Sequence, residues 1–239
     1  MNRERFRFFR AMLHESDLWI GVPHAEFKTR MQSASVDELL RLRKVLEGYM
    51  AENPEFGNSK EALPLPPVPA RIPEEIRIML ECGRQTCTGP MSAVAGLFAE
   101  YVGTRLTDEF KLKEVVVENG GDLYLKNRSE LISVIHAGTS KLSDKMAFVI
   151  PPGARGICTS SGTMGHSLSY GKADALTVIA GSTPLADAWA TSLANRIKRS
   201  EDIEAVLDHV SGLPDLQACA IIAGDHMGVR GEIELKLIT

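Results

Sequence analysis

The chain lacks the features that would assign it at once to the membrane or to nucleic acid. No stretch approaches the roughly 18 apolar residues in a row that indicate a membrane-spanning helix. The charged N-terminus Met1–Phe6 is not followed by the apolar segment of a secretory signal. Lysine and arginine total 27 against 31 aspartates and glutamates, a net charge of -4, so no basic excess points to a phosphate backbone. We therefore expect neither a membrane nor a nucleic-acid partner.

Cysteine is also scarce. Four cysteines in 239 residues are too few for a disulfide scaffold and fit a reducing compartment, so we expect a cytoplasmic protein. Cys82 and Cys87 have a spacing that a zinc site can use, but no second pair follows, and a structural zinc usually takes four ligands. We expect inert thiols and no stoichiometric zinc. A thiol-dependent or zinc protein built on this pair is the alternative.

What the chain does contain is ordinary globular sequence, with 44% hydrophobic and 24% charged residues. Alternating apolar residues predict strands near Phe6–Met12 and Leu18–Ile20, and Ser35 followed by Glu38 is a capping-box pattern that predicts a helix start. The order of elements is roughly strand-strand, helix-helix, strand-strand, used twice. Strands followed by helices favour an α+β fold with antiparallel sheets and helices on one face. We expect residues 1–239 to form one unit of two intertwined halves.

The first motif that could carry chemistry follows a predicted strand and reads Glu118-Asn119-Gly120-Gly121-Asp122. Two glycines let a backbone approach a ligand closely, and their amides can form an anion-binding nest. An ordinary hairpin turn explains the same letters, because Asn-Gly is a common hairpin signal. Asn119, Gly120, Gly121 and Asp122 are the candidate ligand-binding residues here.

The second motif is a loop rich in hydroxyls and glycine. It runs from Cys158 to Ser167 and contains Thr159, Ser160, Ser161, Gly162 and His166. Small donors with free backbone amides suit a phosphate or the polar edge of a ring, although such a loop can also be merely flexible. A serine with His166 could form a nucleophile–base pair, but the G-x-S-x-G elbow of many hydrolases is absent.

The third motif lies in a helix predicted to run from Thr183-Pro184 to about Arg199. Asp187 and Thr191 are four residues apart, which places both side chains on one face, one turn apart. A carboxylate with a hydroxyl is an all-oxygen set that suits Mg²⁺ or Ca²⁺. The simpler interpretation is that Asp187 stabilises the helix dipole near the N-terminus.

Taken in order, these motifs resemble the ApbE-like superfamily, whose name-giving members are FAD:protein FMN transferases. The turn at 118–122 resembles the family's Asn-x-Gly-Gly-Asp, the loop at 159–162 its Thr-Ser-Gly, and 186–191 matches Ala-Asp-Ala-x-Ala-Thr position for position. Segments around Glu15, Thr88–Gly96 and Gly231–Leu235 resemble a short cytosolic branch of that superfamily. The resemblance implies two T-fold-like halves with a pocket between them.

The same resemblance implies a flavin nucleotide, FAD or a relative, and Mg²⁺ held by Asp187, Thr191 and backbone carbonyls. The chain departs from the family where a His-Ile-x-Asp-Pro-x-Thr-Gly segment is shortened and where the lysine of a Lys-Gly-Tyr helix is absent. A Mg²⁺-dependent flavin transferase or pyrophosphatase therefore stands beside a non-catalytic flavin or nucleotide carrier. The catalytic residues and the oligomeric state, including a homo-oligomer, stay open.

Overall fold

The computed structural model describes residues 4–67, 71–162 and 171–238. Its first part opens with two strands, continues through helices and returns to two strands. The elements are β1 (Phe6–Leu13), β2 (Ser16–Pro23), α1 (Arg30–Glu52), α2 (Pro54–Asn58), α3 (Glu74–Thr86), α4 (Val94–Phe110), β3 (Val115–Asn119) and β4 (Asp122–Asn127). Short 3-10 turns, His24–Glu26 and Pro90–Ala93, precede α1 and α4.

The second part repeats this order with shorter helices. Its elements are β7 (Gly153–Ser160), β8 (Ala175–Ala180), α5 (Thr183–Ala194), α6 (Asp202–Val210), β9 (Leu216–Ala223) and β10 (His226–Gly231). Three further strands, β5 (Leu131–Val134), β6 (Met146–Ile150) and β11 (Glu234–Leu237), form a small separate sheet in the order β11-β6-β5.

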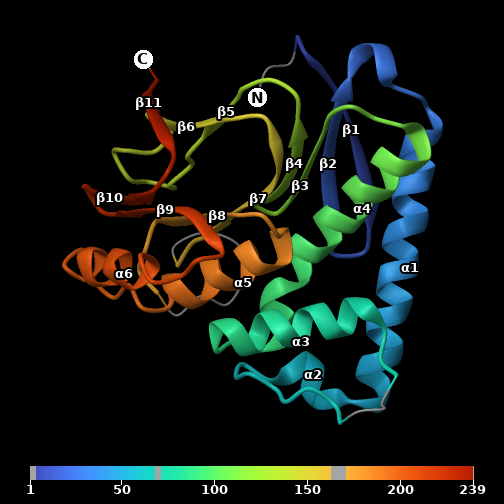
Figure 1. The fold of residues 1–239 in the computed structure, drawn as a ribbon, viewed down its shortest axis with the longest axis horizontal. Helices are drawn as coiled ribbons and strands as arrows, with labels where there is room; N and C mark the ends of the chain where they lie inside the picture. Colours follow the sequence, from blue (N-terminus) through green and yellow to red (C-terminus); the bar gives the residue numbers. More distant parts are fainter. Residues whose placement is uncertain (1–3, 68–70, 163–170, 239) are drawn as a thin grey trace.

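The main sheet has eight strands in the order β1-β2-β3-β4-β7-β8-β9-β10. Every neighbouring pair is antiparallel, including β4 and β7, which join the two parts. Helices α1, α4, α5 and α6 cover one face of this sheet, and the small sheet covers part of the other (Figure 1). The predicted α+β fold, with antiparallel sheets and helices on one face, is confirmed. The description of the chain as one unit of two intertwined halves stays a prediction.

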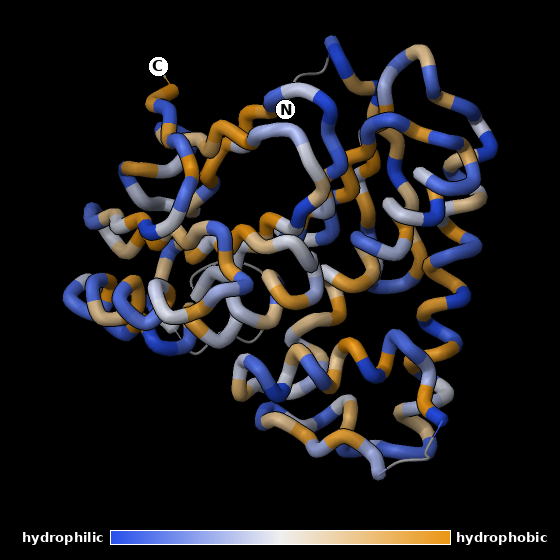
Figure 2. The backbone as a smooth tube through the Cα atoms, in the orientation of Figure 1, coloured by the Kyte–Doolittle hydropathy of each residue, from blue (hydrophilic) through white to orange (hydrophobic). Residues whose placement is uncertain are grey.

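Apolar side chains divide into layers on the two faces of the sheet. Under α1 and α4, residues such as Leu18 and Ile20 pack on Leu39 and Leu97, while Leu176 and Val178 pack under α5 and α6. On the opposite face, Val116, Leu125 and Ile157 meet Phe148 of the small sheet. In Figure 2 the tube of α1 alternates between hydrophobic and hydrophilic colours, as expected for a helix that buries one face.

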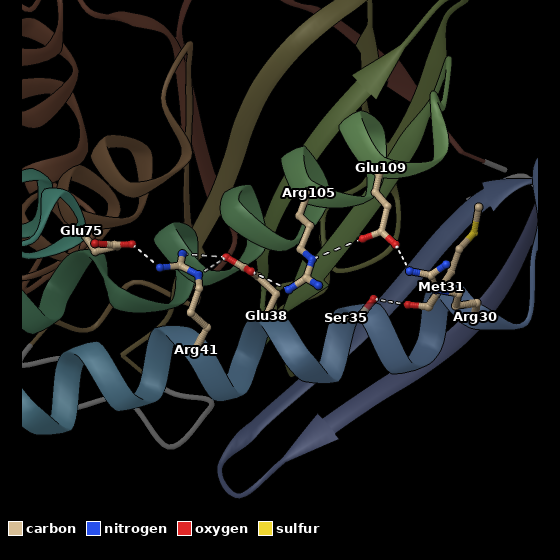
Figure 3. Close-up of polar contacts among 8 residues, drawn as sticks. All are labelled: Arg30, Met31, Ser35, Glu38, Arg41, Glu75, Arg105 and Glu109. Atoms are coloured by element: carbon tan, nitrogen blue, oxygen red, sulfur yellow. Dashed lines mark hydrogen bonds and ion pairs between the residues drawn. The ribbon is translucent and has the colours of Figure 1, made fainter.

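The predicted start of α1 is wrong. The helix begins at Arg30, more than a turn before the capping-box pattern, because Met31 is fully buried and holds this first turn on the core. The Ser35 hydroxyl donates to the Met31 carbonyl at 2.8 Å, which is a bond within the helix and not a cap. The Glu38 carboxylate instead accepts hydrogen bonds from Arg41 at 2.7 Å and Arg105 at 2.9 Å (Figure 3).

Other boundaries differ less. α5 ends at Ala194 and not near Arg199. The proline-containing stretch 54–73 is predicted to be irregular, but a short helix, α2, occupies its start. β10 was not predicted, because Gly228 and a terminal Arg230-Gly231 interrupt its apolar pattern. Within the described part of the chain, no helix is both long enough and apolar enough to cross a membrane.

Candidate functional site

The Asn119–Asp122 segment is a tight hairpin turn between β3 and β4. Gly120 and Gly121 have φ values of 65° and 104°, which glycine adopts without the strain other residues would incur. The Gly121 amide donates to the Glu118 carboxylate at 3.2 Å, so this amide is not free to form the expected anion nest. The simpler interpretation of the motif, a hairpin turn, is therefore correct for the backbone, and the side chains decide whether it is also a site.

The second motif lies directly against this turn. The Thr159 amide donates to the Gly121 carbonyl at 3.2 Å, and Asp122 stands opposite Cys158 in the β4–β7 register. The Thr159 and Thr177 hydroxyls are 2.8 Å apart, and the Gly162 amide donates to the Ala173 carbonyl at 2.9 Å. The Thr159 hydroxyl and the Gly162 amide, which were expected to face a ligand, therefore have protein partners. Ser160 is buried and Ser161 half-buried, whereas His166 lies outside the described residues.

Asp187 reaches this region from α5. Its Oδ2 accepts a hydrogen bond from the Gly96 amide of α4 at 2.9 Å. Gly96 allows the approach because a Cβ there would lie 2.6 Å from the Thr183 carbonyl oxygen and 2.9 Å from Asp187 Cβ. The expected stabilisation of a helix dipole is thus present, but the helix is α4 and not α5. The N-terminus of α4 has no side-chain cap from its own N-cap residue. Asp187, which belongs to α5, instead accepts a hydrogen bond from an amide in the first turn of α4.

The acidic groups here are buried together. Asp122 and Asp187 are 8% and 9% exposed, and neither forms an ion pair with any described residue. Burial, reinforced by the negative charge of Asp187, raises the pKa of Asp122 well above its usual value. Burial also raises the pKa of Asp187, to about 7, against the opposing effect of the amides of Gly96 and Ala95. The site therefore lacks a counter-charge among the described residues.

The neighbouring thiols respond to the same charges. Burial and the nearby carboxylates of Asp122 and Asp187 raise the pKa of Cys158 well above its ordinary range. Burial, with a contribution from Asp187, raises the pKa of Cys82 to about 12. Such thiols stay protonated and are poor nucleophiles or metal ligands at neutral pH. Cys87, in contrast, is exposed at the left-handed C-terminus of α3; the expectation of no zinc stays a prediction.

A cation fits the acidic pair by charge and by donor type. The carboxylates of Asp122 and Asp187, with the half-buried Thr191 one turn further along α5, offer oxygen ligands only. Mg²⁺ typically takes one or two carboxylates and completes its shell with water and substrate phosphates. Among the described residues no group of three histidine, cysteine or acidic side chains could hold a metal, so water, hydroxyl, carbonyl or ligand oxygens would have to complete it.

A cavity of about 350 Å³ adjoins the same helix turn, with Val94 and Ala95 in its lining. Its lining is largely apolar and includes Leu46, Met50, Met91 and Phe98. Asn119 also lines it, and its Nδ2 donates to the Ala95 carbonyl at 3.1 Å. Ala95 and Gly96 thus connect the cavity with the acidic pair.

Part of the cavity lining is charged. Arg43 pairs with Glu15 at 2.9 Å and with Glu47 at 3.2 Å, and its Nε is buried with no hydrogen-bond partner. Sequence reasoning found Asn119 but missed the rest of the cavity. The Arg43–Glu47 spacing does predict a helical ion pair, which the structure contains, but no pattern in the sequence brings Glu15 to α1.

A family model described as "AbpE bacteria" matches residues 1–227. A UPF0280 protein of Methanothermobacter thermautotrophicus is 34% identical over 226 residues, which cover 92% of this chain and 86% of that protein. A UPF0280 protein of Methanosarcina barkeri is 35% identical over 199 residues, or 82% of this chain and 77% of that one.

Two solved structures share the arrangement of the elements. The flavinyl transferase ApbE of Pseudomonas stutzeri, in its apo form, aligns with a TM-score of 0.64 at 16% identity, over 94% of this chain and 93% of that one. The ApbE protein of Thermotoga maritima aligns with a TM-score of 0.60 at 11% identity, over 95% and 97%. At such identity these likenesses establish the fold alone. The full-length match and the relatives together place this chain in the family described as AbpE bacteria, with the ApbE fold.

Proposed function

We propose that this protein binds a flavin nucleotide, FAD or a close relative, together with Mg²⁺, at the first turn of α4. The observation that carries the proposal is the buried pair of Asp122 and Asp187, which has no basic partner among the described residues. Buried like charges are unfavourable unless something compensates them. A divalent cation with a pyrophosphate would supply both the positive charge and the missing ligands.

The adjoining cavity suits the apolar part of such a ligand. A volume of about 350 Å³ lies at the small end of the range for ligand pockets, about 300–1,000 Å³, so it would hold one ring system and not a whole dinucleotide. Asn119, fixed by the Ala95 carbonyl, stands between this cavity and Asp122. A ring in the cavity and a pyrophosphate at Asp122 and Asp187 would extend across the same hairpin turn.

The protein groups would have distinct roles. Asp187, Asp122 and Thr191 would hold Mg²⁺, which when bound polarises a phosphoryl oxygen. Ser160, Ser161 and Gly120 would stand around the phosphates, with hydroxyl and backbone N–H groups as the proposed donors. Cys158 would pack beneath the carboxylates as a neutral thiol, since the pKa of that thiol is raised by burial. The likeness in fold to flavin transferases supports the choice of ligand.

Three uses of the bound nucleotide are distinguishable by their products. In a transferase, an acceptor hydroxyl attacks the phosphorus on the FMN side, its proton is lost to solvent or a base, and AMP leaves; in a pyrophosphatase water takes the place of that hydroxyl. A carrier releases no AMP. We favour nucleotide binding as the common element of all three.

Calorimetric titration with FAD, with and without Mg²⁺, tests the binding. We expect Mg²⁺ to tighten FAD binding, and Asp187→Asn to weaken the Mg²⁺-dependent part by about tenfold or more, equivalent to about 1.4 kcal/mol, because a neutral amide is a poorer ligand for a hard cation. Asp37→Asn is the matched control, because Asp37 is exposed on α1. FAD binding that is equal in both variants and indifferent to Mg²⁺ refutes the metal site. No FAD binding in any sample refutes the proposed function, and AMP in the reaction mixture separates enzyme from carrier.

A further inference from the structure

A second and larger cavity lies in the other part of the chain. Its volume is about 710 Å³, and it is bounded by the end of α6, the beginnings of β7 and β9, and the end of β10. Val210, Leu213 and Leu216 provide an apolar side. Arg155 and Arg230 both line it. No residue of this cavity belongs to the motifs at 118–122, 158–167 or 186–191.

Arg155 carries a charge that the described part of the chain does not neutralise. Its Nη1 donates to the Gln217 side-chain oxygen at 3.3 Å and its Nη2 to the Pro152 carbonyl at 2.9 Å, both uncharged acceptors. No described carboxylate lies within ion-pair distance of it, and its Nε is buried without a partner. Partial burial lowers the pKa of this guanidinium, as expected for a cation that has lost part of its water without gaining an anion.

The local backbone holds this guanidinium in place. Gly153 has a φ of 145°, a value that side chains larger than glycine rarely adopt. A Cβ at Gly153 would lie 2.6 Å from Arg155 Nη2, so the absence of a side chain there creates the space that the guanidinium fills. The group is therefore fixed at both ends, by the Pro152 carbonyl and by Gln217, beside an open volume.

The second arginine of the cavity is already compensated. Arg230 pairs with Asp208 at 2.8 Å, and its exposed neighbour Glu232 contributes a negative charge to the rim. Arg155 is thus the lining cation with unsatisfied charge, and Glu232 is the group that would oppose an anion.

We propose that this cavity binds a small organic anion, with its carboxylate or phosphate oxygens on Arg155 and its apolar body against Val210, Leu213 and Leu216. A guanidinium recognises either oxyanion through parallel N–H bonds. A volume of about 710 Å³ is within the usual range for small-molecule sites, about 300–1,000 Å³. The ligand need not be the nucleotide of the first site.

Calorimetric titration of the full chain with hexanoate, hexyl phosphate, inorganic phosphate and hexanol, at constant low ionic strength, tests this inference. We expect saturable binding of hexanoate or hexyl phosphate, and whichever binds more tightly identifies the charged group. Arg155→Gln should weaken that binding by at least tenfold, Arg155→Lys should weaken it less, and Glu232→Gln should tighten it. Melting temperatures of all variants establish that each is folded.

Several outcomes overturn the proposal. They are the absence of saturable binding by both hexyl anions, equal binding by wild type and Arg155→Gln, and hexanol binding as tightly as the anions. Inorganic phosphate binding as tightly as hexyl phosphate contradicts the role of the apolar side. Because the variants leave Asp187 and the first cavity intact, the difference between wild type and Arg155→Gln reports on this cavity and not on the first site.

Discussion

Replacing Asp187 by asparagine should make the metal-free protein more stable. Asp187 is 9% exposed, and burial raises the pKa of its carboxyl to about 7 from the ordinary 3.8. A carboxyl whose folded pKa is raised contributes stability that is fully present below pH 3.8 and is lost as the pH rises towards 7. At pH 8 the folded wild type therefore contains a buried charge that the unfolded chain would solvate. Asparagine keeps the shape and can still accept from the Gly96 amide.

The size of the effect follows from two opposing contributions. The shift in pKa sets an upper bound of the order of 4 kcal/mol, because each pKa unit corresponds to about 1.4 kcal/mol. That shift already includes the opposing hydrogen bonds from the Gly96 and Ala95 amides, but the asparagine amide is itself a polar group that loses water when buried, which offsets part of the gain. We expect Asp187→Asn to gain roughly 1–3 kcal/mol at pH 8 without metal, or several degrees in melting temperature for a chain of this length.

Denaturation at pH 5 and pH 8, each with and without Mg²⁺, is the assay. The advantage of Asp187→Asn should shrink at pH 5, where the wild-type carboxyl is mostly protonated. Added Mg²⁺ should stabilise the wild type at pH 8 by about 2.7 kcal/mol at a hundred times its Kd, and the variant by at most about 1.4 kcal/mol, because its binding is at least tenfold weaker. Asp37→Asn removes the same charge from an exposed position, so it should gain no stability at pH 8 and should respond to Mg²⁺ as the wild type does. A variant less stable than wild type at pH 8 would mean that the charge serves chiefly to stabilise α4, and the reasoning would fail.

Two further predictions concern close packing at α4 and a buried carboxylate between α1 and α4. Gly96→Ala should destabilise by roughly 1–3 kcal/mol through overpacking, because its Cβ would lie 2.6 Å from the Thr183 carbonyl oxygen. Gly48→Ala, in α1 with nothing within 4 Å, should instead stabilise by about 0.5–1 kcal/mol in the same urea titration, and equal effects of the two would contradict the close approach. Burial alone would raise the pKa of Glu38, but the hydrogen bonds from Arg41 and Arg105 outweigh burial, and the pKa is lowered. The carboxylate therefore contributes to the stability of the fold above pH 4.5, and this contribution is lost as the pH falls through the pKa of the folded state. Glu38→Gln should therefore cost about 1–3 kcal/mol at pH 7 and less at pH 3, whereas the exposed Glu74→Gln should change stability by less than about 0.5 kcal/mol.

Local patterns predicted the parts of the fold that local rules determine. The β3–β4 hairpin follows from Asn119-Gly120, and the start of α5 follows from Thr183-Pro184, because turn and first-turn preferences act over a few residues. The Ser35–Glu38 pattern failed because Glu38 has distant partners, Arg105 among them. A capping box specifies only one of the arrangements that such side chains can adopt.

The same distinction holds for the candidate site: residues in short motifs were predicted, whereas contacts between distant segments were not. Asp122 and Asp187 were found as candidates because each lies in a short motif, although the close approach of Asp187 to α4 depends on Gly96, many residues away. The cavity was missed because its wall is assembled from the β1–β2 turn, α1 and the start of α4. No spacing along the chain connects Glu15 with Arg43, whereas the folded chain puts them 2.9 Å apart.

The first turn of α4 connects all of these parts. The Ala95 carbonyl accepts from Asn119, and the next residue, Gly96, donates to Asp187. A chain selected for stability alone would replace a buried, unpaired Asp187 by a neutral residue, since most proteins contain many positions where stability could be increased. Retaining the charge is understandable if a cation or ligand compensates it in the working state. The buried acidic pair therefore favours a binding site over a structural cap, because an asparagine would serve the Gly96 amide at no electrostatic cost.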